Sequence, residues 1–137
     1  MLTAGLSEAA NPGDFYANRY GTKKLYDKKS VYTPQEVAEF VIKDMGYLGI
    51  SVRIVNDPSE RRANETIVAL NTSSSKHFLF GQGDYHFAIQ LSDGTWADKR
   101  GSAPSRWNML NGEDKIRESN WHSPSYNYGP IFFAIGE

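Results

Sequence analysis

The strongest constraint in this sequence is a pair of alternating segments separated by an Asp-Gly dipeptide. Residues 85–91 and 95–98 alternate apolar and polar side chains, and Asp93-Gly94 lies between them. Asp-Gly in this position is the strongest short-range signal for a β-hairpin, because both residues tolerate the positive φ angles of tight turns. The sequence therefore predicts two antiparallel strands here, in a sheet that contains residues 85–91 and 95–99.

A helix is predicted at residues 34–45. Thr33 and Glu36 have the spacing of a capping box, in which each side chain accepts a hydrogen bond from the other residue's backbone N–H. Pro34 occupies the first helical position, where its missing N–H costs nothing. Apolar residues then recur three and four apart, which predicts one buried face. Gly46 is the expected C-terminal capping residue.

A shorter helix is expected near the N-terminus. Asn11, Pro12 and Asp14 have the residue types preferred at the N-cap, N1 and N3 positions. Gly21 would then end this helix.

Further strands follow the second helix. Alternating or continuous apolar segments at 50–55, 66–70 and 129–135 predict strands, whereas 71–75 and 101–127 have the composition of loops. Helices therefore precede strands, without the regular βαβ alternation of a parallel sheet. This order predicts an α+β fold in which N-terminal helices pack on an antiparallel sheet.

Length and charge narrow the function classes. The 137 residues suffice for one domain with its own core, so a single domain spanning 1–137 is expected. Fifteen Lys and Arg residues nearly cancel sixteen Asp and Glu residues, which argues against a strongly basic nucleic-acid-binding domain. No apolar stretch approaches the ~18 residues of a membrane span. The first residues lack the basic start and apolar stretch of a signal peptide, so none is expected, and the compartment stays open.

The chain has no cysteine, which excludes disulfides and cysteine-based metal sites. The three histidines, His77, His86 and His122, are not spaced as paired zinc ligands. We therefore expect neither a metal nor a cofactor.

His86 and Asp98 are the candidate pair for proton transfer. A carboxylate beside an imidazole fixes its tautomer and leaves the other ring nitrogen free to accept a proton. A two-residue turn would pair Ile89 with Asp98 and direct Asp98 away from His86. A three-residue loop with Gly94 at positive φ would pair Ala88 with Asp98 and place Asp98 on the face of His86. Without this bulge, His86 is an ordinary strand residue and Asp98 a surface charge.

The same region resembles a known family. Residues 84–87 (DYHF) and 92–101 (SDGTWADKRG) resemble the histidine-containing block of bacterial papain-like amidases and peptidases, in the broad NlpC/P60-like group. Residues 128–133 resemble that group's closing strand, and the helix ending at 43–46 is similar to its second helix. The firm resemblance covers about 25 residues, and the looser one covers most of the chain. It implies a papain-like arrangement of N-terminal helices on an antiparallel sheet.

The resemblance implies a Cys–His–polar triad. His86 would be the base, Asp98 the residue that orients it, and the nucleophile a cysteine at the start of an N-terminal helix. By order along the chain the matching region is 5–15, where Ser7 is the closest isostere. Three explanations stay open: the cysteine has been replaced, the protein is a natural pseudo-enzyme, or it uses serine. Serine would be a weaker nucleophile because its hydroxyl is far less ionised than a thiol near neutral pH.

The leading hypothesis is an amide-bond hydrolase or acyl transferase of the papain-like type, inactive as written because the cysteine is absent. By analogy, such a domain acts as a bacterial toxin or effector on a peptide, protein or peptidoglycan substrate. The alternative is a non-catalytic peptide- or glycan-binding domain of the same fold. Trp96, Trp107 and Trp121 are the candidates for a substrate groove, although aromatic residues of this kind also serve as core.

Overall fold

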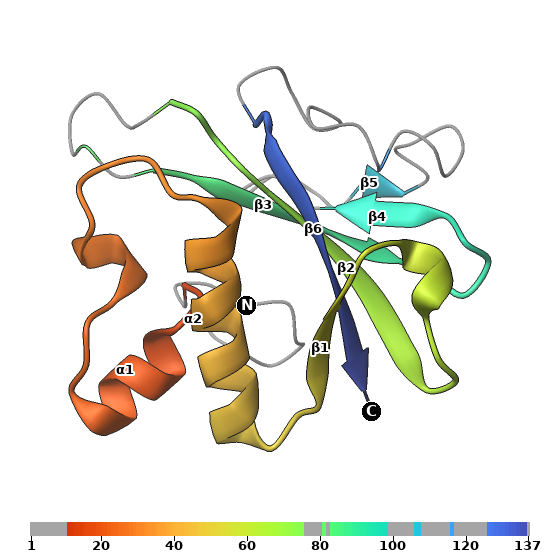
Figure 1. Ribbon diagram of the computed structural model, residues 1–137, viewed down its shortest axis with the longest axis horizontal. Helices are drawn as coiled ribbons and strands as arrows, with labels where there is room; N and C mark the ends of the chain where they lie inside the picture. Colours follow the sequence, from red (N-terminus) through yellow and green to blue (C-terminus); the bar gives the residue numbers. More distant parts are fainter. Residues whose placement is uncertain are drawn as a thin grey trace.

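The computed structural model describes residues 11–75, 81, 83–98, 106–107, 116 and 126–136; the side chains of 98 and 106–107 are excluded from the description. Within these residues, the assigned elements are two α-helices, two short 3-10 helices and a six-stranded sheet. Figure 1 shows how the helices and the sheet are arranged. The helices are α1 (Asp14–Tyr20), η1 (Leu25–Asp27), α2 (Pro34–Leu48) and η2 (Pro58–Glu60). The strands are β1 (Val52–Val55), β2 (Glu65–Thr72), β3 (Tyr85–Gln90), β4 (Trp96–Asp98), β5 (Arg106–Trp107) and β6 (Tyr128–Gly136).

Helix α2 begins where the sequence predicts and ends later. The Thr33 hydroxyl accepts the Glu36 backbone N–H at 3.1 Å, and the Glu36 carboxylate accepts the Thr33 N–H at 2.9 Å. The capping box is therefore confirmed. The prediction that Gly46 ends the helix is wrong, because α2 continues to Leu48 and Gly49 adopts the left-handed conformation.

Helix α1 ends at Gly21 as predicted but begins two residues later than a cap at Asn11 would require. Gly13, at φ 92°, precedes its first residue, Asp14. The buried Asp44 carboxylate of α2 accepts the backbone N–H groups of Gly13 at 2.7 Å and Tyr16 at 2.9 Å. A side chain from a neighbouring helix thus satisfies the N–H groups at the start of α1, which otherwise lack partners. This tertiary contact joins α1 to α2.

The strands form an antiparallel sheet in the order β1-β6-β2-β3-β4-β5. The long strands β2 and β6 lie in its centre, between the edge strand β1 and the β3–β4 hairpin (Figure 1). The predicted α+β class and the antiparallel sheet are confirmed. The loop predicted at 71–75 begins later than expected, because Asn71 and Thr72 continue β2 and pair with β3 and β6.

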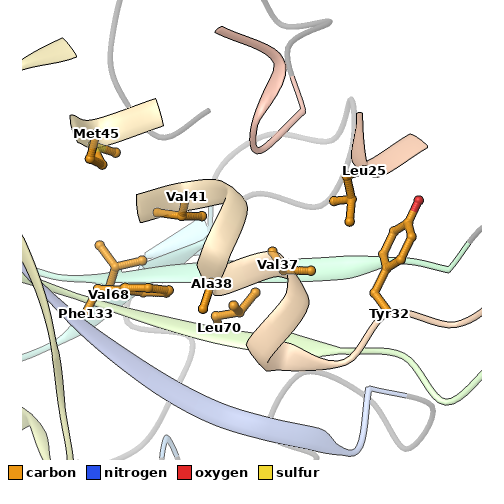
Figure 2. Packing of buried hydrophobic residues seen from close by; sticks show 9 residues of the cluster. All are labelled: Leu25, Tyr32, Val37, Ala38, Val41, Met45, Val68, Leu70 and Phe133. Atoms are coloured by element: carbon orange, nitrogen blue, oxygen red, sulfur yellow. The ribbon is translucent and has the colours of Figure 1, made fainter. Parts of the chain in front are cut away.

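Each face of the sheet carries its own apolar cluster. The cluster on the α2 side contains residues from α2, β2, β6 and the segment before α2. The ring of Phe133 extends from the sheet toward α2 (Figure 2). The nine buried members of this cluster are Leu25, Tyr32, Val37, Ala38, Val41, Met45, Val68, Leu70 and Phe133. The opposite face contains Val55, Ile67, Ala69, Ala88, Trp96, Ile116, Phe132 and Ala134. The helix in the described residues that covers the first face is α2, and α1 packs outside it on α2. The helices in the described part of the chain are too short or too polar to cross a membrane.

Candidate functional site

His86 is the second residue of β3 and lies on the sheet face opposite α2. It pairs with Asn71 of β2, and the next residue on its face, Ala88, belongs to the cluster remote from α2. Alternation along the strand therefore directs Tyr85 and Phe87 toward α2 and His86 away from it. The His86 residue is 7% exposed. A nucleophile that uses His86 as its base must approach from this second face or around the end of the sheet.

The hairpin has the three-residue bulged loop that the proton-transfer hypothesis requires. The Leu91 N–H donates to the Thr95 carbonyl at 2.7 Å, and the Gly94 N–H donates to the Leu91 carbonyl at 2.9 Å. Gly94 has a φ of 86°, and Ala88 pairs with Asp98. The register therefore places Asp98 on the face of His86, one diagonal step along the neighbouring strand. The predicted contact between the Asp98 carboxylate and the His86 imidazole lies outside the described part of the structure, because the Asp98 side chain is not described.

Polar groups are buried at the same end of the sheet. Within the described part of the chain, the buried polar or charged residues are Asp44 and four residues of this region: Asn71, Thr72, Ser73 and His86. Burying polar groups is unfavourable unless they are hydrogen-bonded. The Asn71 amide and the Ser73 hydroxyl are hydrogen-bonded, whereas the buried Thr72 hydroxyl has no partner among the described residues. The Ser73 N–H donates to the Asp84 carbonyl at 3.0 Å and extends the β2–β3 ladder past Thr72.

Tyr126 connects the buried polar residues. Its backbone carbonyl accepts the Asn71 side-chain Nδ2–H at 3.2 Å, and its phenol donates a hydrogen bond to Asp84 Oδ2. Its ring lies 6.1 Å from the His86 ring, centroid to centroid, with 68° between the planes. Asp84 Oδ1 in turn accepts the Tyr85 N–H at 2.8 Å. Burial and the hydrogen bond with Asp84 raise the pKa of Tyr126, so the phenol is protonated at neutral pH.

Sequence reasoning did not identify Asn71 or Asp84 as site residues. Asn71 fell in a segment predicted to be a loop, and its position opposite His86 comes from the long-range pairing of β2 with β3. Asp84 precedes the histidine strand, and a polar residue at such a boundary is also an ordinary turn residue. In the sequence, each of the two is only a polar residue near the end of a strand. Such a residue does not by itself indicate a functional site.

The structure describes the three tryptophans that were predicted to line a groove to different extents. Trp96 is 1% exposed and packs in the cluster remote from α2, so its burial favours the core interpretation. Its indole Nε1 has no hydrogen-bond acceptor among the described residues. Trp107 contributes its backbone to β5 opposite Ala97. Trp121 and the proposed nucleophile position, Ser7, lie outside the described residues.

An open hollow of about 340 Å³ lies at the other end of the hairpin. Its lining comes from the start of β2, the turn before it and the β3–β4 loop: Arg61, Asn64, Glu65, Thr66, Gln90, Leu91, Ser92 and Gly94. Gln90 is four residues beyond His86 on β3, which corresponds to about 13 Å along a strand. The hollow is therefore separate from the polar residues around His86.

The described residues contain no group of three metal-ligating side chains. Comparisons with protein-family models, with curated proteins and with solved structures find no match to this chain.

Proposed function

We propose that this domain is an amide-bond hydrolase or acyl transferase of the papain-like type, with His86 as base and Asp98 as the residue that orients it. The observation that carries the proposal is the bulged loop at Gly94, which pairs Asp98 with Ala88 and so places it on the face of His86. A regular two-residue turn would have separated the two residues. The burial of His86 beside Asn71 and Tyr126, which are themselves hydrogen-bonded, supports the same function.

The chain connectivity allows the proposed nucleophile position to reach His86. The Tyr85 hydroxyl donates to Asn11 Oδ1 at 2.7 Å, which ties residue 11 to the start of β3. Ser7 precedes Asn11 by four residues, and four extended residues span at most about 14 Å. His86 directly follows Tyr85 near the end of the sheet, so Ser7 can approach His86 around this end.

The proposed chemistry is acyl transfer. The side chain at position 7 attacks the carbonyl carbon of an amide, while His86 accepts the hydroxyl or thiol proton and then donates it to the leaving amine. Backbone N–H groups near residue 7 would stabilise the oxyanion. Water or another acceptor then releases the acyl group. With serine in place of the cysteine that the resemblance implies, we expect little activity. The substrate class would be a peptide, a protein or peptidoglycan, consistent with a bacterial toxin or effector domain.

A non-catalytic binding domain is the alternative, favoured by one observation. The chain contains no cysteine, although residues 84–87 and 92–101 resemble a block of enzymes that use one. Such a domain would bind a peptide or glycan without hydrolysing it.

Reaction of an introduced thiol with iodoacetamide at pH 6 tests the proposal. The experiment compares Ser7→Cys with Ser59→Cys, an exposed position in η2 that serves as a control thiol. If a base lowers the thiol pKa from ~8.5 to ~6, the thiolate fraction rises about a hundredfold. Because intrinsic nucleophilicity falls with pKa, the net acceleration is about tenfold. We expect His86→Gln and Asp98→Asn in the Ser7→Cys background to remove most of it.

Equal rates for Ser7→Cys and Ser59→Cys, unaffected by His86→Gln, would show that position 7 is not next to the base. The nucleophile assignment would then be wrong, and the binding alternative would be favoured. Loss of the acceleration in His86→Gln but not in Asp98→Asn would retain the base and remove the orienting role of Asp98.

A further inference from the structure

Tyr126 touches the candidate site at three points. Its ring packs against the His86 imidazole at 6.1 Å between centroids. Its phenol is anchored on Asp84, and its backbone carbonyl accepts the Asn71 amide at 3.2 Å. Asn71 is itself the residue that pairs with His86 across β2 and β3. Tyr126 is therefore held through its phenol by Asp84, which directly precedes β3, and through its backbone carbonyl by Asn71 of β2.

The anchor of the phenol is itself fixed. Asp84 Oδ1 accepts the Tyr85 backbone N–H at 2.8 Å, and the Asp84 carbonyl accepts the Ser73 N–H at 3.0 Å. These contacts attach Asp84 to Tyr85, the first residue of β3, and to Ser73, which directly follows β2. The carboxylate oxygen that accepts the phenol thus has a defined place relative to His86, which lies two residues further along β3.

The Tyr126 ring beside the His86 imidazole limits rotation of the imidazole about χ2. A half-turn about χ2 exchanges the position of Nδ1 with that of Cδ2, and the position of Nε2 with that of Cε1. A base that serves one nucleophile must therefore hold one ring orientation and one tautomer. The edge-to-face contact with Tyr126 is a favourable geometry. It is lost in the intermediate orientations through which the imidazole must pass to turn over.

We propose that Tyr126, anchored by Asp84 and Asn71, is a positioning residue that holds the His86 imidazole in the single orientation required for proton transfer. The proposal rests on the proposed function in that His86 is taken to be the base. It adds a residue that neither the sequence motif nor the hairpin register includes. Tyr126 acts through His86 and does not itself contact the reacting atoms.

The imidazole can be observed directly by ¹⁵N NMR of protein labelled at its three histidines, with His86→Gln assigning the signal. Tyr126→Leu removes the ring, whereas Tyr126→Phe removes only the hydroxyl that Asp84 accepts. Tyr128→Leu is the control, because Tyr128 is 39% exposed and lies two residues away. Thermal unfolding and circular dichroism show whether each variant is folded.

We expect the wild-type His86 nitrogens to report one tautomer in the neutral form. In Tyr126→Leu the tautomer ratio should move toward that of free imidazole, and ring relaxation should show increased motion. Tyr126→Phe should show a smaller change of the same kind, and Tyr128→Leu none. If Tyr126→Leu does not fold, Tyr126→Phe decides: an unchanged tautomer ratio and unchanged ring motion in a folded Tyr126→Phe would overturn the proposal.

A second readout connects the positioning role to reactivity. In the Ser7→Cys background, Tyr126→Phe should reduce the accelerated reaction with iodoacetamide several-fold, and Tyr128→Leu should not. The two failures are distinguishable. If the thiol at position 7 is not accelerated at all, the proposed function fails while the NMR result still tests the contact with His86. If the thiol is accelerated but neither readout responds to Tyr126→Phe, the positioning role fails alone.

Discussion

Ala88 of β3 pairs directly with Asp98 of β4, because a three-residue loop rather than a two-residue turn joins the strands. One residue in the loop decides this register, since Gly94 has a φ of 86°. Side chains alternate along a strand, so a shift of one residue would move Asp98 to the other face of the sheet. The geometry of the candidate proton-transfer pair thus depends on a backbone conformation that glycine adopts easily.

We predict that Gly94→Ala destabilises the domain. A β-carbon in the left-handed region costs roughly 1–2 kcal/mol, and the free energy of unfolding measured in urea should fall by about this amount. Gly46→Ala is the matched control. Gly46 lies inside α2, and a β-carbon there would meet nothing within 4 Å. It should therefore stabilise the domain by about 0.5–1 kcal/mol through helix propensity.

A Gly94→Ala variant as stable as the wild type would contradict the left-handed conformation at this position. The bulged register would then have no local cause, and the placement of Asp98 relative to His86 would need another explanation.

The pair between Arg53 and Glu65 predicts one part of the acid denaturation profile. Arg53 Nε and Nη2 donate to the two Glu65 carboxylate oxygens at 2.9 and 2.7 Å. These bonds lower the Glu65 pKa from 4.5 to about 2. A carboxyl with a lowered folded-state pKa contributes stability that is present above its unfolded pKa and lost as the pH falls through the folded value. We expect urea unfolding of Glu65→Gln to show a flatter pH dependence than wild type between pH 4.5 and about 2.

Glu39→Gln is a suitable control for this prediction, because Glu39 is an exposed glutamate on α2. The prediction fails if Glu65→Gln and wild type lose stability in parallel across this interval.

Local sequence signals predicted the elements whose causes are themselves local. The capping box at Thr33 and the Asp-Gly hairpin appear where expected. The end of α2 was misplaced because two glycines competed for it. Gly49 ends the helix because the next residue, Ile50, donates its N–H to the Met45 carbonyl at 2.8 Å and packs with Met45 in the core. This is the hydrogen-bond and apolar pattern of a Schellman motif, which Gly46, followed by exposed Tyr47, does not provide.

The candidate site was predicted only in part for the same reason. The register of Asp98 follows from a loop of three neighbouring residues, so the sequence could offer it as one of two alternatives. The other site contacts join distant segments: Asn71 meets His86 through strand pairing, and Tyr126 meets Asp84 across 42 residues. Packing also determines which face of the sheet α2 covers. The helix packs on the face that carries the bulkier apolar side chains of β3, so His86 lies on the other face.

The core beneath α2 predicts a contrast between two leucines. Leu70 is 0% exposed in the cluster beneath α2, whereas Leu48, at the end of that helix, is 39% exposed. Leu70→Ala should lower the free energy of unfolding by about 2–5 kcal/mol, because it removes buried apolar contacts and leaves a cavity. Leu48→Ala should change it by no more than about 0.5 kcal/mol. Similar losses in the two variants, measured by urea unfolding, would contradict the packing of α2 on the sheet.

Asp44 gives a prediction with the opposite pH dependence to that of Glu65. Its carboxylate is fully buried and accepts the N–H groups of Gly13 and Tyr16, which attach α1 to α2. Burial, the largest contribution, outweighs these hydrogen bonds and raises the Asp44 pKa above its usual 3.8. The folded state therefore binds this proton more tightly than the unfolded chain does. By linkage, the contribution is fully present below pH 3.8 and is lost as the pH rises through the raised folded-state pKa.

Asp44→Asn removes this titrating carboxyl. Above pH 3.8, the free energy of unfolding should therefore fall less steeply with rising pH in the variant than in the wild type. The advantage of the wild type over the variant should shrink as the pH rises through the raised pKa, in urea unfolding measured from pH 4 to 7. The variant should also be less stable overall, because an amide offers one acceptor oxygen where two N–H groups need partners, and an unsatisfied buried N–H costs roughly 1–3 kcal/mol. Glu39→Gln is the control, because it removes an exposed carboxyl from the same helix. If the difference between Asp44→Asn and wild type is constant with pH, the buried carboxyl does not titrate above its usual value in the folded domain.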